Sequence, residues 1–320
     1  MKAKLAGLAH YLPHCIVDNE EILKKYPEAG TENKIFKKTG IKERRYSEYL
    51  TTSDMATKSS IALLDKMKIG SCEIDCVIVG TSTADYFFPS TASVVIKGIG
   101  AKNAFGFDIN AACPSFLVAI EQSVMMITLG RAKNIIVCGA DRMSRTLNSD
   151  DYKTGLLFGD ASASVLLSVC DGDEKGINHC YSKVVADDLE DIYLKTPFSC
   201  DNWMSEKFIM DGRKVYQRGI ELTVKTVKEF LNKYSLSLAD YKFIIPHQSN
   251  LRIIEKIAKQ LKCHHEKFLT NIESVGNTAS ASVPLCLSQK VDEGVVNKGD
   301  RLLLVSYGAG YIVSITDLFF

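Results

Sequence analysis

The feature that most constrains this chain is an internal repeat. The first half carries, in order, DCVIVGTST, AFGFDINAAC, NIIVCGAD and SASVLLSV, and the second half carries YKFIIPHQSN, KFLTNIESVGNTASASVP, RLLLVSYGAG and YIVSITDLFF. Paired segments share few identical residues, but each pair has the same order of apolar strand, polar or glycine-containing loop, and helix. Such a repeat of alternating strands and helices predicts layered α/β structure. We therefore predict a duplicated α/β fold with halves at 1–170 and 171–320, since 320 residues exceed the usual size of a single core.

The repeat also predicts where a site would lie. In α/β structures, ligands bind at the loops that follow the strand ends. Four such loops would face one another across the two halves: AAC ending at Cys113, PHQSN (246–250), GNTASAS (276–282) and YGAG (307–310). They supply a thiol, an imidazole, amide side chains and backbone N–H groups, which together can perform nucleophilic catalysis and stabilise an oxyanion.

The loop at Cys113 follows an apolar run of Phe105, Phe107 and Ile109, which we expect to be a buried strand. Pro114 favours the first helical position, so Cys113 is expected to cap a long apolar helix. A helix N-terminus stabilises a thiolate, which would make Cys113 a nucleophile. The residues of this stretch alone are equally consistent with a small buried apolar thiol.

Composition and charge exclude several classes of function. The formal net charge of +1 gives no indication of binding to nucleic acid or to a membrane surface. We find no secretion signal and no apolar run near the length of a membrane span, which takes about 20 residues. Ten scattered cysteines therefore predict reduced thiols in a cytoplasmic protein. Two groups could be considered as metal ligands, but neither has a second ligand pair at zinc-site spacing, so we expect no metal: Cys72 with Cys76, and Cys263 with His264 and His265.

Several motifs then carry a family resemblance. The segments INAACPSF, LLFGDASAS, PHQSNLRII, SVGNTASASVP and YGAG, with KKTGIKERR and FFPSTAS, extend over nearly the whole chain. In this order they resemble β-ketoacyl-acyl carrier protein synthase III, a thiolase-fold condensing enzyme. The resemblance implies a thiolase fold of duplicated αβαβα layers and a homodimer. It also implies that the first half carries the nucleophile and the second half carries the catalytic His and Asn.

The resemblance assigns roles to individual positions. It makes Cys113 the nucleophile, His247 and Asn277 the other catalytic residues, and the backbone N–H groups of Cys113 and Ala309 the oxyanion hole. Its acyl pocket would be formed by Phe88 (reaching the partner subunit's pocket), Leu157 and Phe158. Its contacts to the substrate's pantetheine arm would be Thr39, Gly212, Tyr216 and Asn250.

The implied reaction loads an acyl group on Cys113 and condenses it, with decarboxylation, with a malonyl thioester such as malonyl-ACP. The product is a β-ketoacyl thioester of fatty-acid or secondary-metabolite biosynthesis, and no cofactor is required. An alternative is an acyltransferase that passes the acyl group to an alcohol, amine or other small acceptor, with His247 as general base. A non-catalytic partner subunit and a papain-like cysteine hydrolase are further hypotheses.

The resemblance leaves the acyl donor open between acyl-CoA and acyl-ACP. Lys34 and Tyr152 stand where the family has the Trp and Arg that stack the adenine of coenzyme A. An acidic carrier protein would need cations at the mouth of the site. The helix after HQSN places such cations on one face, and we predict that they dock the carrier: Arg252, Lys256 and Lys259.

Overall fold

The computed structural model describes residues 1–148, 150–170, 172, 175–185, 189–196, 199 and 207–320. Two sheets form its frame. The first has the strand order β1 (Ala3–Tyr11), β7 (Asp160–Val169), β6 (Asn134–Arg142), β4 (Cys76–Gly80) and β5 (Phe105–Ile109). The second has the order β8 (Ile177–Val184), β13 (Ile312–Phe319), β12 (Arg301–Gly308) and β11 (Phe243–Pro246).

The two sheets have the same topology. In the first, β5, β4 and β6 are parallel, and β7 and β1 follow antiparallel; in the second, β11 and β12 are parallel, and β13 and β8 follow antiparallel. The predicted strand at KFLT is the exception. There the chain forms a 3-10 turn at His265–Lys267, and Phe268 makes only a single parallel bridge to Ile244. The division of the chain at residue 170 stays a prediction.

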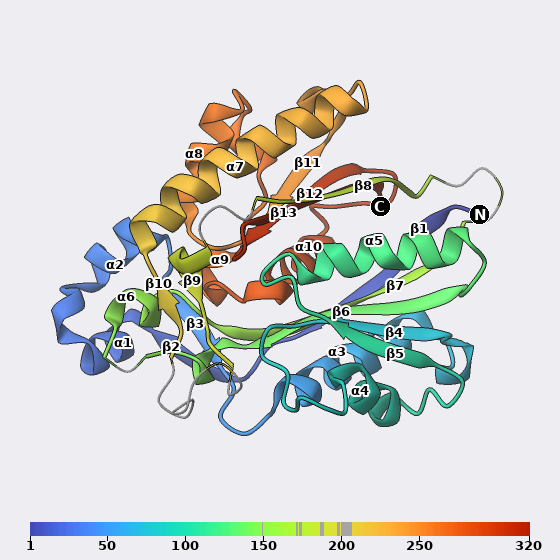
Figure 1. The fold of residues 1–320 in the computed structure, drawn as a ribbon, viewed down its shortest axis with the longest axis horizontal. Coiled ribbons are helices and arrows are strands. Elements are labelled where there is room, and N and C mark those ends of the chain that lie inside the picture. Colours follow the sequence, from blue (N-terminus) through green and yellow to red (C-terminus); the bar gives the residue numbers. More distant parts are fainter. Residues whose placement is uncertain (149, 171, 173–174, 186–188, 197–198, 200–206) are drawn as a thin grey trace.

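Helices cover both sheets and separate them, so that five layers follow one another in Figure 1. The central layer contains α5 (Ser115–Thr128) and α10 (Ser282–Asp292), which lie between the sheets. The outer face of the first sheet is covered by α3 (Thr52–Met67) and α4 (Thr91–Ile99). The outer face of the second is covered by α7 (Gly212–Lys233) and α8 (Leu251–Gln260).

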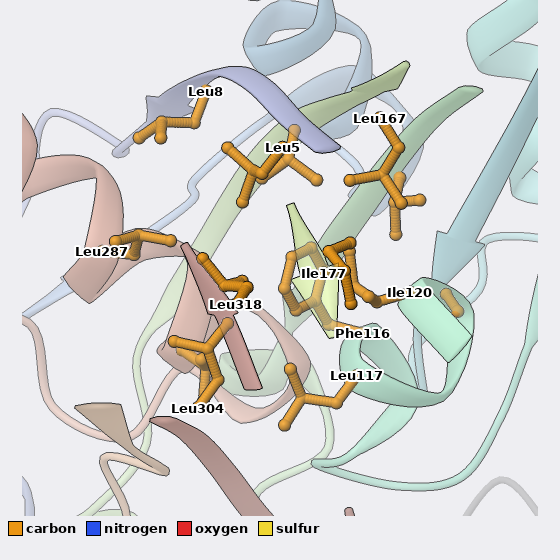
Figure 2. Packing of buried hydrophobic residues seen from close by; sticks show 14 of the residues in the cluster. Leu5, Leu8, Phe116, Leu117, Ile120, Leu167, Ile177, Leu287, Leu304 and Leu318 are labelled. Atoms are coloured by element: carbon orange, nitrogen blue, oxygen red, sulfur yellow. The ribbon is translucent and has the colours of Figure 1, made fainter. Parts of the chain in front are cut away.

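The hydrophobic core of the central layer explains why α5 is apolar around most of its circumference. A helix with sheets on two sides must bury more than one face. Phe116, Leu117 and Ile120 of α5 are almost fully buried, and Figure 2 shows them beside Leu304 and Leu318 of the second sheet. By contrast, α8 packs against a sheet on only one of its faces. Its sequence is therefore amphipathic, with apolar residues on that face alone.

Smaller elements surround one end of this frame. They are β2 (Cys15–Asp18) paired with β3 (Glu43–Tyr46), α1 (Asn19–Lys25), α2 (Glu32–Thr39), α6 (Tyr152–Gly155), β9 (Ile192–Tyr193) paired with β10 (Ile209–Met210), and α9 (Ile272–Val275). This is the end at which α2, α6 and the β9–β10 pair approach the first turns of α7 and α8 (Figure 1).

The prediction that β5 is buried was wrong for this chain. The side chains of Phe105 and Phe107 are 40% and 36% exposed. The cause is topological: β5 pairs only with β4 and is therefore an edge strand of the first sheet.

Candidate active site

A cavity of about 800 Å³ opens where the loops of the two sheets meet. Cys113, His247, Asn277 and Ala309 all line it. These residues come from the four strand-end loops singled out by the repeat, which lie between Cys113 and Ala309 in the chain. The carboxyl ends of parallel strands lie at one edge of a sheet, which is why duplication of the unit brings the four loops together.

Cys113 lies in a tight turn between β5 and α5. Ala112 has a left-handed backbone (φ 52°), which is uncommon for a residue with a Cβ and costs free energy. The turn is held by Asn110, whose Oδ1 accepts from the Ala112 N–H at 3.1 Å. Pro114 is the helix N-cap and Ser115 the first helical residue, so Cys113 precedes the cap by one residue instead of being the cap.

Gly308 brings the last loop against this turn. A Cβ at Gly308 would lie 2.9 Å from the Cys113 backbone nitrogen and 2.6 Å from Pro114 Cδ, so only glycine permits this approach. The next residue is Ala309, and the positive φ of the turn (107°) falls on Gly310. Ala309 therefore keeps an ordinary backbone conformation beside Cys113.

His247 follows β11 and is 2% exposed. Its backbone N–H donates to the Val305 carbonyl at 2.7 Å, which fixes the residue to β12. Its Nδ1 lies 2.6 Å from Ser282 Oγ, and its ring is edge-on to Tyr307 with centroids 5.4 Å apart. With Nδ1 occupied, Nε2 is the ring nitrogen available to a ligand.

Asn277 is held through both its backbone and its side chain. Its N–H donates to the Leu157 carbonyl at 2.8 Å, and its carbonyl accepts from the Gly159 N–H at 2.9 Å. Its Oδ1 accepts from the Ala279 N–H at 3.0 Å. The side-chain Nδ2 is therefore the group left to donate to a ligand in the cavity.

A buried carboxylate joins the two halves behind these loops. Asp141, at the end of β6, accepts through Oδ1 from the Ser82 N–H at 2.8 Å and the Thr83 hydroxyl at 2.9 Å. Its Oδ2 accepts from the Ser280 N–H at 2.9 Å. Ser82 lines the cavity, and Ser280 belongs to the loop that carries Asn277. This carboxylate therefore holds the Ser82 loop and the Asn277 loop in fixed positions relative to each other.

Comparison with known proteins identifies the family. The family model described as 3-oxoacyl-(acyl-carrier-protein) synthase III matches residues 107–187, and the C-terminal model of the same family matches residues 231–316. A beta-ketoacyl-(acyl-carrier-protein) synthase III of Clostridium perfringens is 37% identical over 313 residues, 96% of this chain and 96% of that protein. The chain belongs to the 3-oxoacyl-(acyl-carrier-protein) synthase III family.

Solved structures agree with this assignment. The 3-oxoacyl-(acyl-carrier-protein) synthase III of Aquifex aeolicus has a TM-score of 0.92 and 30% identity, with 99% of this chain and all of that chain covered. The priming beta-ketosynthase of the R1128 polyketide pathway has a TM-score of 0.92 and 28% identity, with 99% and 96% covered. The fold is thus the duplicated αβαβα thiolase fold, as the resemblance implied, and the chain is an acyl-transferring condensing enzyme.

In this synthase, an apolar cluster surrounds the thiol side of the cavity. Phe158 and Phe208 are edge-on with centroids 5.1 Å apart. The cluster also contains Met143 and Ala279, and the partly buried residues packed against it are Cys113, Leu147, Leu157, Ile192 and Met210. Sequence reasoning named Leu157 and Phe158 but missed Met143 and Phe208, since neither lies in a recognisable motif.

Phe88 lies outside this cluster. Its side chain is 85% exposed, and it does not line the cavity of its own chain. Phe87 beside it is 65% exposed. A position for Phe88 in an acyl pocket therefore requires a second copy of the chain.

The four residues expected along the substrate arm all line the cavity. Two of them also stabilise the local structure through hydrogen bonds. The Thr39 hydroxyl donates to the Ile35 carbonyl at 2.8 Å, and Asn250 caps α8 by accepting from the Arg252 N–H at 2.8 Å. Gly212 and Tyr216 lie in the first turns of α7. Tyr152 also lines the cavity, whereas Lys34 does not.

The predicted docking cations lie on α8, outside the cavity. Lys256 and Lys259 are exposed. Arg252 is partly engaged, because its Nε donates to the Lys37 carbonyl at 2.9 Å and its guanidinium pairs with Glu255 at 2.9 Å.

The expectation of a resting thiolate was wrong. Burial, with a smaller contribution from the charge of Asp141, raises the pKa of Cys113 to about 12, and these effects outweigh the helix N-terminus. Burial likewise lowers the pKa of His247 to about 3. At neutral pH the site therefore holds a thiol and a neutral imidazole.

These shifts predict how alkylation of Cys113 depends on pH. Because only the thiolate reacts, and its pKa is raised, the rate with iodoacetamide is expected to rise about tenfold per pH unit from pH 7 to 10. An ordinary thiol, with a pKa of about 8.5, would reach a plateau within this range. The rate is measured by mass spectrometry of the Cys113 peptide, and a plateau near pH 8 to 9 would contradict the raised pKa.

None of the helices described is long and apolar enough to cross a bilayer. No cluster of three or more His, Cys, Asp and Glu side chains is placed to hold a metal ion in the part of the chain that the structure describes.

Proposed function

We propose that this synthase transfers an acyl group from a thioester to Cys113 and then condenses it with a malonyl thioester. The observation that carries the proposal is the shared cavity, which is lined by the Cys113 thiol and by two neutral hydrogen-bond donors, His247 and Asn277. Family membership supports the same reaction, since the matching proteins are named for 3-oxoacyl-carrier synthesis.

In the first step, Cys113 Sγ attacks the thioester carbonyl. The carbon–sulfur bond to the donor breaks, and the thiol proton passes in net to the leaving thiolate. The developing oxyanion would be held by the backbone N–H groups of Cys113 and Ala309, whose close approach depends on Gly308. The acyl chain would extend into the apolar cluster of Phe158 and Phe208.

In the second step, the carbonyl oxygen of the malonyl thioester accepts hydrogen bonds from His247 and Asn277. The bond to the terminal carboxylate breaks, carbon dioxide leaves, and the electron pair becomes an enolate stabilised by these donors. The enolate carbon attacks the acyl-Cys113 carbonyl, the Cys113 carbon–sulfur bond breaks, and the β-ketoacyl thioester is released. Neutral donors suit this step, because a strong acid would protonate the enolate.

Transfer to an alcohol or amine acceptor is less well supported. That reaction requires a general base whose pKa lies near the working pH. Burial lowers the pKa of His247 to about 3, which makes it a weak base and leaves it a neutral donor.

The test is incubation of the protein with acetyl thioester and a malonyl carrier protein. Release of carbon dioxide together with a β-ketoacyl product is expected. A covalent acyl adduct on Cys113 without either product would favour the acyltransferase, and absence of any adduct would favour a non-catalytic subunit.

An acyl carrier protein is the partner that we propose for α8. Arg252→Glu is expected to raise the KM for malonyl-ACP about tenfold, because an acidic carrier would meet a reversed charge, while the KM for malonyl-CoA changes less than twofold. Steady-state kinetics with both substrates measure this.

Lys68→Glu is the matched control for docking, because it makes the same charge change at an exposed position at the end of α3. Equal effects of Arg252→Glu on both substrates would remove the docking role. The acyl donor itself, acyl-CoA or acyl-ACP, is decided by comparing the two in the same loading assay.

A second copy of this chain is the other partner that we propose. The edge strand β5 exposes Phe105 and Phe107, and Phe87 and Phe88 are exposed on the loop before α4. Unpaired edges and exposed apolar side chains are stabilised by pairing with another chain. Sedimentation at micromolar concentration should give the mass of two chains, and a single-chain mass would contradict the dimer.

The setting that we propose is fatty-acid or secondary-metabolite synthesis in the cytoplasm. The cysteines described in the structure all carry free thiols, which suits a reducing compartment.

A further inference from the structure

Two serines of α10 each contact a histidine at Nδ1. Ser282 Oγ lies 2.6 Å from His247 Nδ1, and Ser288 Oγ lies 2.8 Å from His10 Nδ1. His247 lines the cavity, whereas His10 lies on β1 and does not. The helix therefore contains one serine–histidine pair inside the site and a similar pair outside it.

The hydroxyl proton of Ser282 determines how the first pair is arranged. Ser282 is fully buried, and His247 Nδ1 is the only hydrogen-bond partner of its Oγ among the described residues. If Nδ1 carried a proton and donated it, the serine proton would be buried without an acceptor, which is unfavourable. The hydroxyl must therefore donate to Nδ1, and a neutral ring whose Nδ1 accepts carries its proton on Nε2.

The N-terminus of α10 and burial both keep the His247 ring neutral. Ser282 is the first residue of the 11-residue helix α10, whose N-terminus disfavours a positive charge on the neighbouring ring. The edge-on Tyr307 ring packs against the imidazole. Burial lowers the pKa of the ring to about 3, so that it stays neutral at working pH.

We infer that Ser282 is a positioning residue that fixes the Nε2–H tautomer of His247, so that the imidazole donates to the malonyl carbonyl oxygen. This inference rests on the condensation proposed above. It concerns only the second step, since the loading of Cys113 does not use this donor.

The kinetic test uses Ser282→Ala and, as the matched control, Ser288→Ala. Ser282→Ala is expected to slow malonyl decarboxylation about 10- to 100-fold, by analogy with the loss of a partner that orients a metal-bound histidine. Its rate of Cys113 acylation should change less than twofold. Ser288→Ala removes a comparable buried hydroxyl from the same helix and should leave both half-reactions unchanged.

The second measurement is the tautomer itself, by ¹⁵N NMR of histidine-labelled protein, with the His247 signal assigned by its loss in His247→Gln. The wild-type ring should be protonated at Nε2, and Ser282→Ala should add a population protonated at Nδ1. A wild-type Nδ1–H tautomer would overturn the inference even if the variant did not fold. So would a wild-type rate of decarboxylation in Ser282→Ala. If the wild-type protein releases no carbon dioxide at all, the condensation fails, and the NMR result still decides the tautomer.

Discussion

Replacing Cys113 with serine is expected to abolish the acyl-enzyme and to lower the overall rate by at least about 10³-fold, as loss of a nucleophile does in other acyl-transfer enzymes. A serine hydroxyl has the size to occupy the turn between Ala112 and Pro114, but it ionises far less readily than a thiol, and the neutral His247 is too weak a base to activate it. The measurement is the mass of the intact protein after incubation with an acyl thioester.

Cys72→Ser is the control, because Cys72 is exposed and does not line the cavity. It should load normally, with the adduct on the Cys113 peptide. Normal loading of Cys113→Ser, or an adduct on another cysteine, would contradict the assignment of the nucleophile.

Asn277→Asp is expected to lower the rate of malonyl decarboxylation about 10²- to 10³-fold, the cost of losing one oxyanion donor. The retained Oδ1 can still accept from the Ala279 N–H, so the loop is expected to keep its shape. The second oxygen replaces the Nδ2 donor with an acceptor, and its charge opposes the charge of the enolate. Acylation of Cys113 should be nearly unchanged, since it does not use this donor.

The decarboxylation is followed by release of labelled carbon dioxide. Asn232→Asp is the control, because it makes the same change of charge at an exposed position on α7. If Asn277→Asp impaired acylation and decarboxylation equally, Asn277 would act through the structure of the loop instead of as a donor.

The repeat made much of the fold predictable. Strand and loop patterns are local properties of the chain. Because they follow one another in the same order in both halves, they implied that the two sheets share one topology. The same repeat placed Cys113, His247, Asn277 and Ala309 at strand ends that had to meet, and the structure places all four around one cavity. Motif order then supplied the family, which the comparisons confirmed.

Predictions about the surroundings of these residues were less successful. The apolar pattern of β5 predicted burial, but whether a strand is central or at an edge depends on the pairing of the whole sheet. Phe208 was missed because it reaches the cavity from a stretch without a motif. Ser282 belongs to the GNTASASVP segment, but only the tertiary packing brings its hydroxyl to Nδ1 of His247.

Cys113 illustrates the same division between sequence and tertiary structure. The sequence by itself determined that a cysteine would stand at a turn between a strand and an apolar helix, facing a histidine and an asparagine from the second half. Only the tertiary structure decided the protonation state, which is a thiol with a pKa of about 12 beside a neutral imidazole. The physical reason is that a helix terminus acts on its neighbour locally, whereas desolvation depends on every segment that excludes water from the site, and those segments come together only in the folded chain.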